Sequence, residues 1–362
     1  MKDESIYAAL SHRGVSRRDF MKFCATITAT LSLPSAFTPK IAEALEKKKK
    51  PYVVWLHFQD CTGDTEAILR ASNPSVAELL LDIISLEYHE TIMAPSGKLA
   101  EKSRHDVITS QKGNYIAIVE GSIPTKDDGI YCVVGGRTAL SIAKEVCSNA
   151  LVNFTVGSCA AWGGLGSANP NPTGAVGLQD VVSGAKIVNF PGCPMNPVNL
   201  VAAIVHFLTF GSLPALDSRN RPLFAYGKRI HDNCERRAHF DAGQFVRQWG
   251  DEGHRKGWCL YEMGCKGPEA FLNCPTVKFN DKTSWPVQAG HGCVACAADH
   301  NWDKVYPFYG RLQKVPGFGI ETTADKVGLG LAAAAAAGVA GHAVASSLKK
   351  DKDCSSKEES NK

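Results

Sequence analysis

The stretch Tyr52-Val-Val-Trp-Leu-His57, followed closely by Cys61-Thr62-Gly63-Asp64, decides the fold class of this chain. Its apolar and β-branched residues favour a buried strand, and a cysteine-bearing loop begins where that strand ends. The pattern recurs further along, with predicted strands at 115–119, 150–156 and 186–189. The last two strands again lead into cysteine-bearing loops, Gly157-Ser158-Cys159 and Pro191-Gly192-Cys193.

Helical periodicity between these strands completes an alternation of strands and helices. Apolar residues recur at helical spacing in 75–86, 137–148 and 197–209. The alternation predicts an α/β fold with a doubly wound parallel sheet. Because open α/β sheets bind ligands outside the carboxyl ends of their strands, the cysteines of the three loops are expected to converge on one metal centre. Cys147 lies within a predicted helix instead and is expected to be a buried structural residue.

The composition indicates a globular, metal-binding protein. Of 362 residues, 44% are hydrophobic and 21% are charged, which excludes wholesale disorder. Forty basic and 36 acidic residues give a net charge of +4, which is too balanced for a nucleic-acid-binding protein. Thirteen cysteines are more than a core needs, and a chain of this size needs no disulfide stapling. Metal ligation therefore explains the cysteines best.

Beyond about residue 222 the alternation stops. Residues 225–320 are rich in glycine, cysteine, histidine and aromatic residues, with one helix predicted near 241–250. Periodic apolar residues are too few to hold this part together, so inorganic centres are expected to stabilise it. It contains six cysteines: Cys234, Cys259, Cys265, Cys274, Cys293 and Cys296. The pairs His231-x-x-Cys234 and Cys293-x-x-Cys296 have metal-ligand spacing, which fits zinc as well as iron–sulfur centres.

The first 44 residues are predicted to be an export signal. Ser16-Arg17-Arg18-Asp19-Phe20 resembles a twin-arginine motif, a mildly apolar run follows to Phe37, and Ala42-Glu43-Ala44 offers a cleavage site. Cys24 lies in this leader and is expected to be absent from the mature protein. The alternative is an amphipathic first helix with a chance arginine pair.

The other end of the chain carries a second membrane signal. Residues 327–348 contain no formal charge and are long enough to span a bilayer, and Lys349 and Lys350 follow them. These lysines favour a cytoplasmic tail over 349–362, which places the main body on the exported side. The alternative is an alanine-rich soluble helix that packs on a partner.

Motifs along the whole chain resemble one family. They are Leu56-His57-x-x-x-Cys61-Thr62-Gly63, Ile84-Ser85-Leu86-Glu87-Tyr88, Gly157-Ser158-Cys159-x-x-Trp162-Gly163, Pro191-Gly192-Cys193-Pro194, Arg229-Ile230-His231-x-x-Cys234, His239-Phe240-Asp241-Ala242-Gly243, Cys259-Leu260-Tyr261, Gly264-Cys265-Lys266-Gly267-Pro268 and Gly290-His291-Gly292-Cys293-x-x-Cys296. Together they resemble the small, electron-transferring subunit of membrane-bound, periplasmic uptake nickel–iron hydrogenases.

The resemblance implies a flavodoxin-like domain over 51–221 and an irregular domain over 222–322, followed by a C-terminal membrane anchor. Three iron–sulfur clusters are implied, with ligands carried over by position. Cys61, Cys159 and Cys193 resemble the family's ligands of the proximal cluster. The medial [3Fe–4S] ligands correspond to Cys274, Cys293 and Cys296. The distal [4Fe–4S] ligands correspond to His231, Cys234, Cys259 and Cys265.

The same resemblance implies the partners and the activity. The nickel–iron site lies in a separate large subunit, so this chain is expected to be active only together with that subunit. Electrons from hydrogen oxidation would pass through the three clusters to a membrane quinone-linked acceptor, such as a b-type cytochrome. Competing classes are an exported protein with structural disulfides and a zinc-binding interaction module, and iron and sulfide analysis separates all three.

One position departs from the family pattern. The usual proximal motif is Cys-x-Gly-Cys, whereas Asp64 stands here where the fourth thiolate belongs. Asp64 is the favoured fourth ligand of a proximal [4Fe–4S] cluster, as an oxygen donor in a set of three cysteines and one aspartate. Two alternatives stay open: Cys132 supplies the fourth ligand, or the cluster has three irons and Asp64 lies merely nearby.

Overall fold

Five parallel strands form the centre of the first structural unit. The computed structural model describes residues 5–71, 75–280, 282–304, 308–311 and 324–359. It divides the chain into one unit of residues 1–235 and 263–312 and another of residues 236–262 and 313–362. The strands are β1 (Tyr52–His57), β2 (Ser85–His89), β3 (Tyr115–Glu120), β7 (Val152–Val156) and β9 (Ile187–Phe190).

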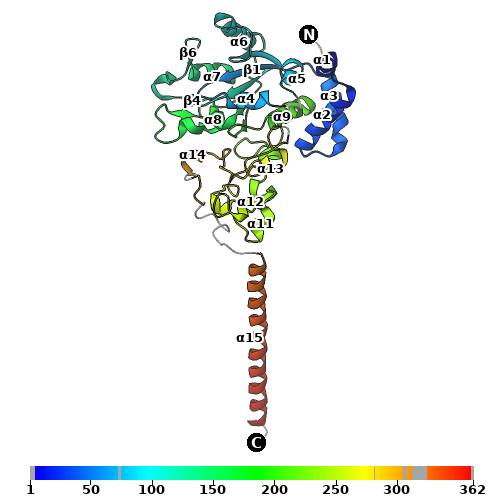
Figure 1. Ribbon diagram of the computed structural model, residues 1–362, viewed down its shortest axis with the longest axis vertical. Helices are drawn as coiled ribbons and strands as arrows, with labels where there is room; N and C mark the ends of the chain where they lie inside the picture. The colour runs from blue at the N-terminus through cyan, green and yellow to red at the C-terminus, as the bar shows by residue number, and fades with distance from the viewer. Residues whose placement is uncertain (1–4, 72–74, 281, 305–307, 312–323, 360–362) are drawn as a thin grey trace. The chain divides into compact units, whose positions relative to one another are not determined.

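The strand order is β2-β1-β3-β7-β9, and every neighbouring pair is parallel. This is the flavodoxin-like order of a doubly wound sheet, so the predicted fold class is confirmed. The connecting helices are α4 (Gly63–Leu69), α5 (Val76–Glu78), α6 (Lys98–Ser110), α7 (Ala139–Ser148), α8 (Gly157–Trp162) and α9 (Pro197–Phe210). Figure 1 shows these elements gathered around the sheet.

Both faces of the sheet are buried, as the near-continuous apolar strands require. On β1, Val54 and Leu56 pack in the same apolar cluster as residues of α6 and α7. The alternate residues Val53 and Trp55 point to the other face and are equally inaccessible. Cys147 on α7 is fully buried in this core, as expected from its place in a helix.

Helix α9 shows how local sequence sets an element's ends. The Asn196 side chain accepts a hydrogen bond from the Val198 amide and caps the helix, and Pro197 occupies the first helical position. Gly211 ends the helix with a φ of +68°, which a side chain would disfavour. The sequence-based prediction of 197–209 is therefore confirmed almost to the residue.

Two predicted helices differ from the structure. The helix expected over 75–86 ends as the π-helical turn η2 (Leu79–Ile83), and residues from Ser85 form the edge strand β2. The apolar run suits either state, and parallel pairing of β2 with β1 selects the strand. The helix expected near 241–250 is wrong: α11 (Arg237–Asp241) ends first and α12 (Glu252–Arg255) begins later, capped by Asp251.

The remaining described elements are short, apart from two groups at the ends of the chain. The N-terminal group is α1 (Ile6–His12), α2 (Arg17–Thr30) and α3 (Thr38–Lys47). At the other end, α15 (Ala324–Glu359) contains the apolar span Gly328–Ser346, which is long enough to cross a membrane. Short elements of the first unit are η1 (Ser35–Phe37), β4 (Ile123–Pro124), η3 (Lys126–Gly129), β5 (Val133–Val134), β6 (Arg137–Thr138), η4 (Gly164–Ser167), β8 (Ala175–Val176), η5 (Leu178–Asp180), α10 (Leu223–Tyr226), η6 (Ile230–Asn233), α13 (Cys274–Val277) and α14 (Asn301–Lys304).

The core predicts the effect of a large-to-small substitution. Phe154 and Phe190 are fully buried on adjacent strands, with their ring centroids 5.8 Å apart in an edge-to-face arrangement. Phe154→Ala should lower the free energy of unfolding by about 3–5 kcal/mol, because burial and the ring contact are both lost. Leu99→Ala, at a position 69% exposed, is the control and should leave the melting temperature nearly unchanged. Equal melting temperatures for the two variants would contradict this.

Candidate metal centres

Three cysteine-bearing loops meet at the carboxyl edge of the sheet. Cys61 follows β1, Cys159 lies in α8 directly after β7, and Cys193 follows β9. Burial, and after it the negative charges of neighbouring thiols and of Asp64, raises the pKa of Cys193 to about 12. Burial likewise raises the pKa of Cys159 to about 11, and the charges of Asp64 and Cys61 add to it. These groups therefore lie close enough to repel one another as anions.

Asp64 belongs to this group by position. Its side chain is 9% exposed, and its Oδ1 accepts a hydrogen bond from the Met195 amide at 2.6 Å. Burial, followed by the charge of Glu120, raises the pKa of Asp64 to about 8. A Cβ atom on Gly157 would lie 2.0 Å from Asp64 Oδ2, and Gly157 has a φ of +82°. Only glycine there leaves room for the carboxylate beside α8.

The carboxylate of Glu120, at the end of β3, organises the first loop. It is fully buried and accepts hydrogen bonds from the amides of Asp64, at 3.0 Å, and Thr65, at 3.2 Å. The Thr65 hydroxyl, at 2.6 Å, and the Trp55 indole, at 3.3 Å, also donate to it. Sequence reasoning missed this role. The only available signal was an acidic residue closing an otherwise apolar strand.

His57 belongs to the same buried network. Its Nδ1 lies 2.7 Å from Asp60 Oδ2, and its Nε2 lies 3.4 Å from His89 Nε2. Burial lowers the pKa of His57, but the hydrogen bond to Asp60 and the nearby carboxylates outweigh it and leave the pKa raised. Although His57, Asp60 and Glu120 lie close enough for a shared cation, these atoms already engage one another and the first loop. His57 is thus a hydrogen-bonding core residue, as expected.

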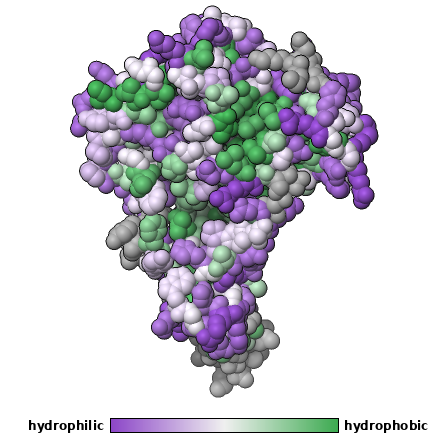
Figure 2. All heavy atoms as spheres, turned by 45° about the horizontal axis from the view of Figure 1, so that its top comes forward, coloured by the Kyte–Doolittle hydropathy of each residue, from purple (hydrophilic) through white to green (hydrophobic). Residues whose placement is uncertain are grey.

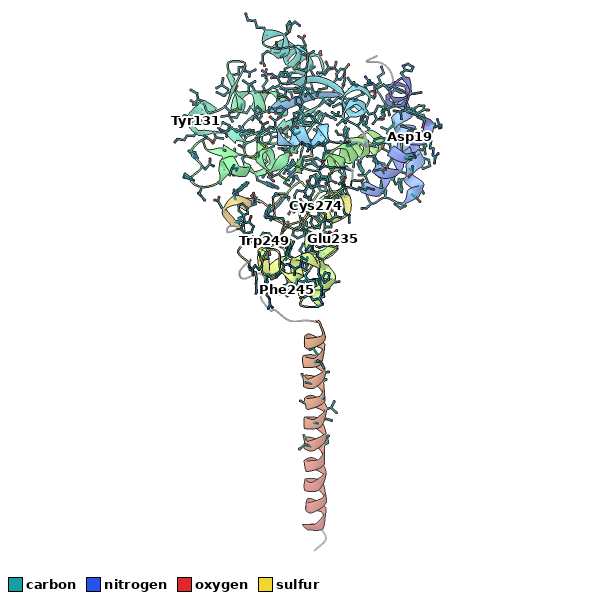
Figure 3. All side chains as sticks on the ribbon, in the orientation of Figure 1. Asp19, Tyr131, Glu235, Phe245, Trp249 and Cys274 are labelled. Atoms are coloured by element: carbon teal, nitrogen blue, oxygen red, sulfur yellow. The ribbon has the colours of Figure 1, made fainter. Side chains whose placement is uncertain are left out.

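A second group of cysteines surrounds a cavity in the first unit. Cys274, which begins α13, lines it together with Cys293 and Cys296, and the apolar Pro286 also lines it (Figure 3). The cavity volume is about 1110 Å³. Burial is the main cause that raises the pKa of all three thiols. Four thiols thus line the cavity: Cys193 from the loop after β9, and Cys274, Cys293 and Cys296 from the segment beyond the sheet.

Backbone hydrogen bonds join the two groups. The Ser158 hydroxyl donates to the Cys296 carbonyl, and the Gly192 amide donates to Ser158 Oγ at 3.0 Å. The backbone of Cys193 lies near the Cys296 thiol and lowers its pKa, although burial has the larger effect and leaves that pKa raised. Residues next to Cys159 and Cys193 therefore also hold Cys296.

A third group of candidate ligands adjoins the second group through Cys293. The amide of Cys293 donates to Cys265 Sγ at 3.2 Å. His231, in η6, is 6% exposed, and its amide donates to the Gly267 carbonyl at 3.3 Å, close to Cys265. The amide of Cys234 donates to the His231 carbonyl at 3.4 Å. His231, Cys234 and Cys265 are thereby gathered within the first unit.

Cys259, the fourth residue expected at the distal site, belongs to the second unit. It is buried with Phe245 and Tyr261, and its amide donates to the Gln244 carbonyl at 3.1 Å.

Cys132, proposed above as an alternative proximal ligand, is half-buried and packs against the core beside α7. Burial raises the pKa of the Cys132 thiol to about 11.

These donor sets fit iron–sulfur clusters. Among the cysteines whose side chains the structure describes, none forms a disulfide. Gathered thiolates repel one another unless a cation compensates them, and iron in a cluster supplies that charge. Cys274, Cys293 and Cys296 offer three thiols, which suits a cluster with one iron fewer, and the group around Asp64 offers three thiols and one carboxyl.

Comparison with known proteins assigns the family. The family model described as the C-terminal part of the NiFe/NiFeSe hydrogenase small subunit matches residues 226–309, and the model of the NADH ubiquinone oxidoreductase 20 kDa subunit matches residues 61–207. The chain is 48% identical over 352 residues to the quinone-reactive Ni/Fe-hydrogenase small chain of Wolinella succinogenes, covering 95% of this chain and 99% of that relative. The chain belongs to the nickel–iron hydrogenase small subunits.

Two further relatives of this hydrogenase small subunit agree. It is 49% identical over 302 residues to the periplasmic [NiFe] hydrogenase small subunit 1 of Nitratidesulfovibrio vulgaris, covering 83% of this chain and 95% of that one. The solved structure of the reduced, active Ni-Fe-Se hydrogenase of Desulfomicrobium baculatum matches with a TM-score of 0.69 and 33% identity, covering 73% of this chain and 100% of that chain. The family carries iron–sulfur clusters, as the resemblance implied.

The raised pKa of Asp64 predicts a pH-dependent stability of the iron-free chain. Folded, the carboxyl keeps its proton up to about pH 8; unfolded, it ionises near pH 4. Since the unfolded chain loses this proton first, stability falls as the pH rises between these two values. Asp64→Asn removes that loss, so its advantage in melting temperature over the original chain should grow from pH 5 to pH 8. If the melting temperatures of the original chain and of Asp64→Asn changed equally with pH, the raised pKa of Asp64 would be contradicted.

Proposed function

We propose that the small subunit passes electrons, released by hydrogen oxidation in the large subunit, through three iron–sulfur clusters to a quinone-linked acceptor in the membrane. Iron–sulfur clusters supply one-electron storage at potentials that their protein ligands tune. The observation that carries the proposal is that hydrogen bonds link the cysteine-bearing segments of the first unit to one another. The Ser158 hydroxyl, beside Cys159, donates to the Cys296 carbonyl, and the amide of Cys293 donates to Cys265 Sγ.

The proposed ligands follow this series. The proximal site is Cys61, Asp64, Cys159 and Cys193; the medial [3Fe–4S] site is Cys274, Cys293 and Cys296; the distal [4Fe–4S] site is His231, Cys234, Cys259 and Cys265. An amide that donates to a thiolate sulfur lowers the negative charge on it, so the bond from the Cys293 amide to Cys265 favours the reduced state. Imidazole is neutral where thiolate is anionic, so His231 raises the distal potential and favours electron exit.

The surface of the small subunit and its apolar C-terminal span support two partners, the large subunit and the membrane. Figure 2 shows hydrophobic residues gathered on the visible face of the main body, as an interface with a large subunit requires. The Wolinella succinogenes relative is described as quinone-reactive and the Nitratidesulfovibrio vulgaris relative as periplasmic. With the span Gly328–Ser346 as an anchor, we infer a body on the periplasmic side of the membrane, exported by the twin-arginine route.

Iron analysis tests the proposal. The complex purified with its large subunit should contain roughly eleven irons in the small subunit, the number for two four-iron clusters and one three-iron cluster. Mössbauer and EPR spectra should resolve three centres. A folded, iron-free small subunit in an active complex would reject the relay, and zinc in place of iron would identify an interaction module instead.

The proximal site has its own test in Asp64→Cys. An oxygen donor is harder than sulfur, so exchanging it should change the Mössbauer parameters of one proximal iron and lower the proximal potential. Cys132→Ser is the matched variant, and its proximal spectrum should equal that of the original protein. Unchanged proximal signals in Asp64→Cys, or altered ones in Cys132→Ser, would reject Asp64 as the ligand.

A further inference from the structure

The predicted leader has the pattern of a helix made to pack on a protein surface. The buried residues of α2 recur at intervals of three and four, so they lie on one face of the helix. They are Phe20, Phe23, Cys24, Ile27 and Thr28. Asp19, by contrast, lies on the exposed side of α2 (Figure 3). An export signal that is recognised only by its average apolarity does not require its apolar residues to lie on one side of a helix.

The surface that receives this face is α9. Helix α9 is apolar over nearly its whole circumference, so it needs a cover on the side away from the sheet. Both α2 and α3 contact it, and Figure 1 shows them beside it. The ring centroids of Phe37 and Phe210 are 6.0 Å apart, and Lys40 Nζ lies 4.9 Å from the centroid of the same Phe210 ring.

Polar contacts hold the leader in register with the body. Arg13 Nε donates to Asp82 Oδ1 at 3.0 Å, and Asp82 in η2 is only 2% exposed. Burial raises the pKa of Asp82, and the charge of Arg13 opposes that shift. Arg17 of the twin-arginine motif pairs at 3.2 Å with Glu46 of α3, two residues beyond the predicted leader. The Arg13–Asp82 and Arg17–Glu46 pairs form only when the leader is docked in this one position.

The docked leader also borders the proposed cluster sites. Thr26, Ala29 and Thr30 of α2 line the 1110 Å³ cavity. The same cavity is lined by Cys193, Cys274, Cys293 and Cys296. The leader is therefore part of the cavity wall that the candidate ligands share.

We propose that the attached leader, described here from residue 5 to residue 44, acts as an in-chain cap: it docks on α9, covers its apolar face and closes one side of the cluster cavity. The docking follows from the contacts above. The shielding of iron rests in addition on the proposed function. The cap protects an apolar surface and its clusters until the leader is removed.

Cys24 reports on the docking. It is fully buried, and burial raises the pKa of its thiol to about 12, so it should react slowly with N-ethylmaleimide in the full chain with the leader attached. Phe37→Asp removes the contact with Phe210 and should speed Cys24 alkylation about tenfold, because helices this short are marginal once undocked. Peptide mass spectrometry measures the rate.

Two controls separate undocking from unfolding. Ala36→Asp adds the same charge at an exposed neighbouring position and should leave the Cys24 rate unchanged. Cys147 in the core of α7 should stay protected in every variant. Equal Cys24 rates in the original chain and in Phe37→Asp, with Cys147 protected, would overturn the docking.

Iron loss tests the shielding separately. In the anaerobically isolated, leader-bearing chain, Phe37→Asp should release iron to a chelator several-fold faster than Ala36→Asp, starting from matched Mössbauer spectra. Equal release rates would overturn the shielding and leave the docking intact. Absence of clusters in every chain would overturn the proposed function and the shielding together, whereas the Cys24 result would still decide the docking.

Discussion

A single buried carboxylate, that of Glu120, holds the loop around which the proximal group is arranged. Burying a carboxylate is costly unless hydrogen bonds compensate it, and four donors from β1 and the start of α4 converge on this one. Because two of these donors are the backbone amides of Asp64 and Thr65, the position of the loop after β1 is determined by the end of β3. The neighbouring strands β1 and β3 must therefore be paired in register before this site can exist.

The proximal group in turn fixes the next one. Ser158, at the start of α8, donates its hydroxyl hydrogen to the Cys296 carbonyl. Cys293, three residues earlier, bonds through its amide to Cys265. The irregular part of the first unit is thus attached to the sheet at the cysteines themselves. This explains how a segment with little periodic apolar sequence can have a defined conformation, since its candidate ligands also make its structural contacts.

Sequence patterns predicted the sheet better than the segments beyond it. Runs such as Tyr52–His57 are apolar enough to indicate a buried strand, and their cysteines follow directly, so the carboxyl edge could be located. The edge strand β2 was missed because its apolar run also suits a helix, and only pairing with β1 distinguishes the two. The helix expected near 241–250 failed because a cap acts locally: the Asp251 side chain accepts from the His254 amide and starts α12 only after that range.

The residue types and spacing were sufficient to assign the α/β class, the cysteine-bearing loops, the apolar C-terminal span and the family, because strand patterns and ligand motifs are local. Tertiary structure alone decided that Glu120 supports the Asp64 loop, that Cys296 lies beside Cys193, and that α2 and α3 pack on α9. Each of these contacts joins segments tens of residues apart. Such contacts depend on how buried charges and apolar faces find partners in three dimensions, which no local pattern specifies.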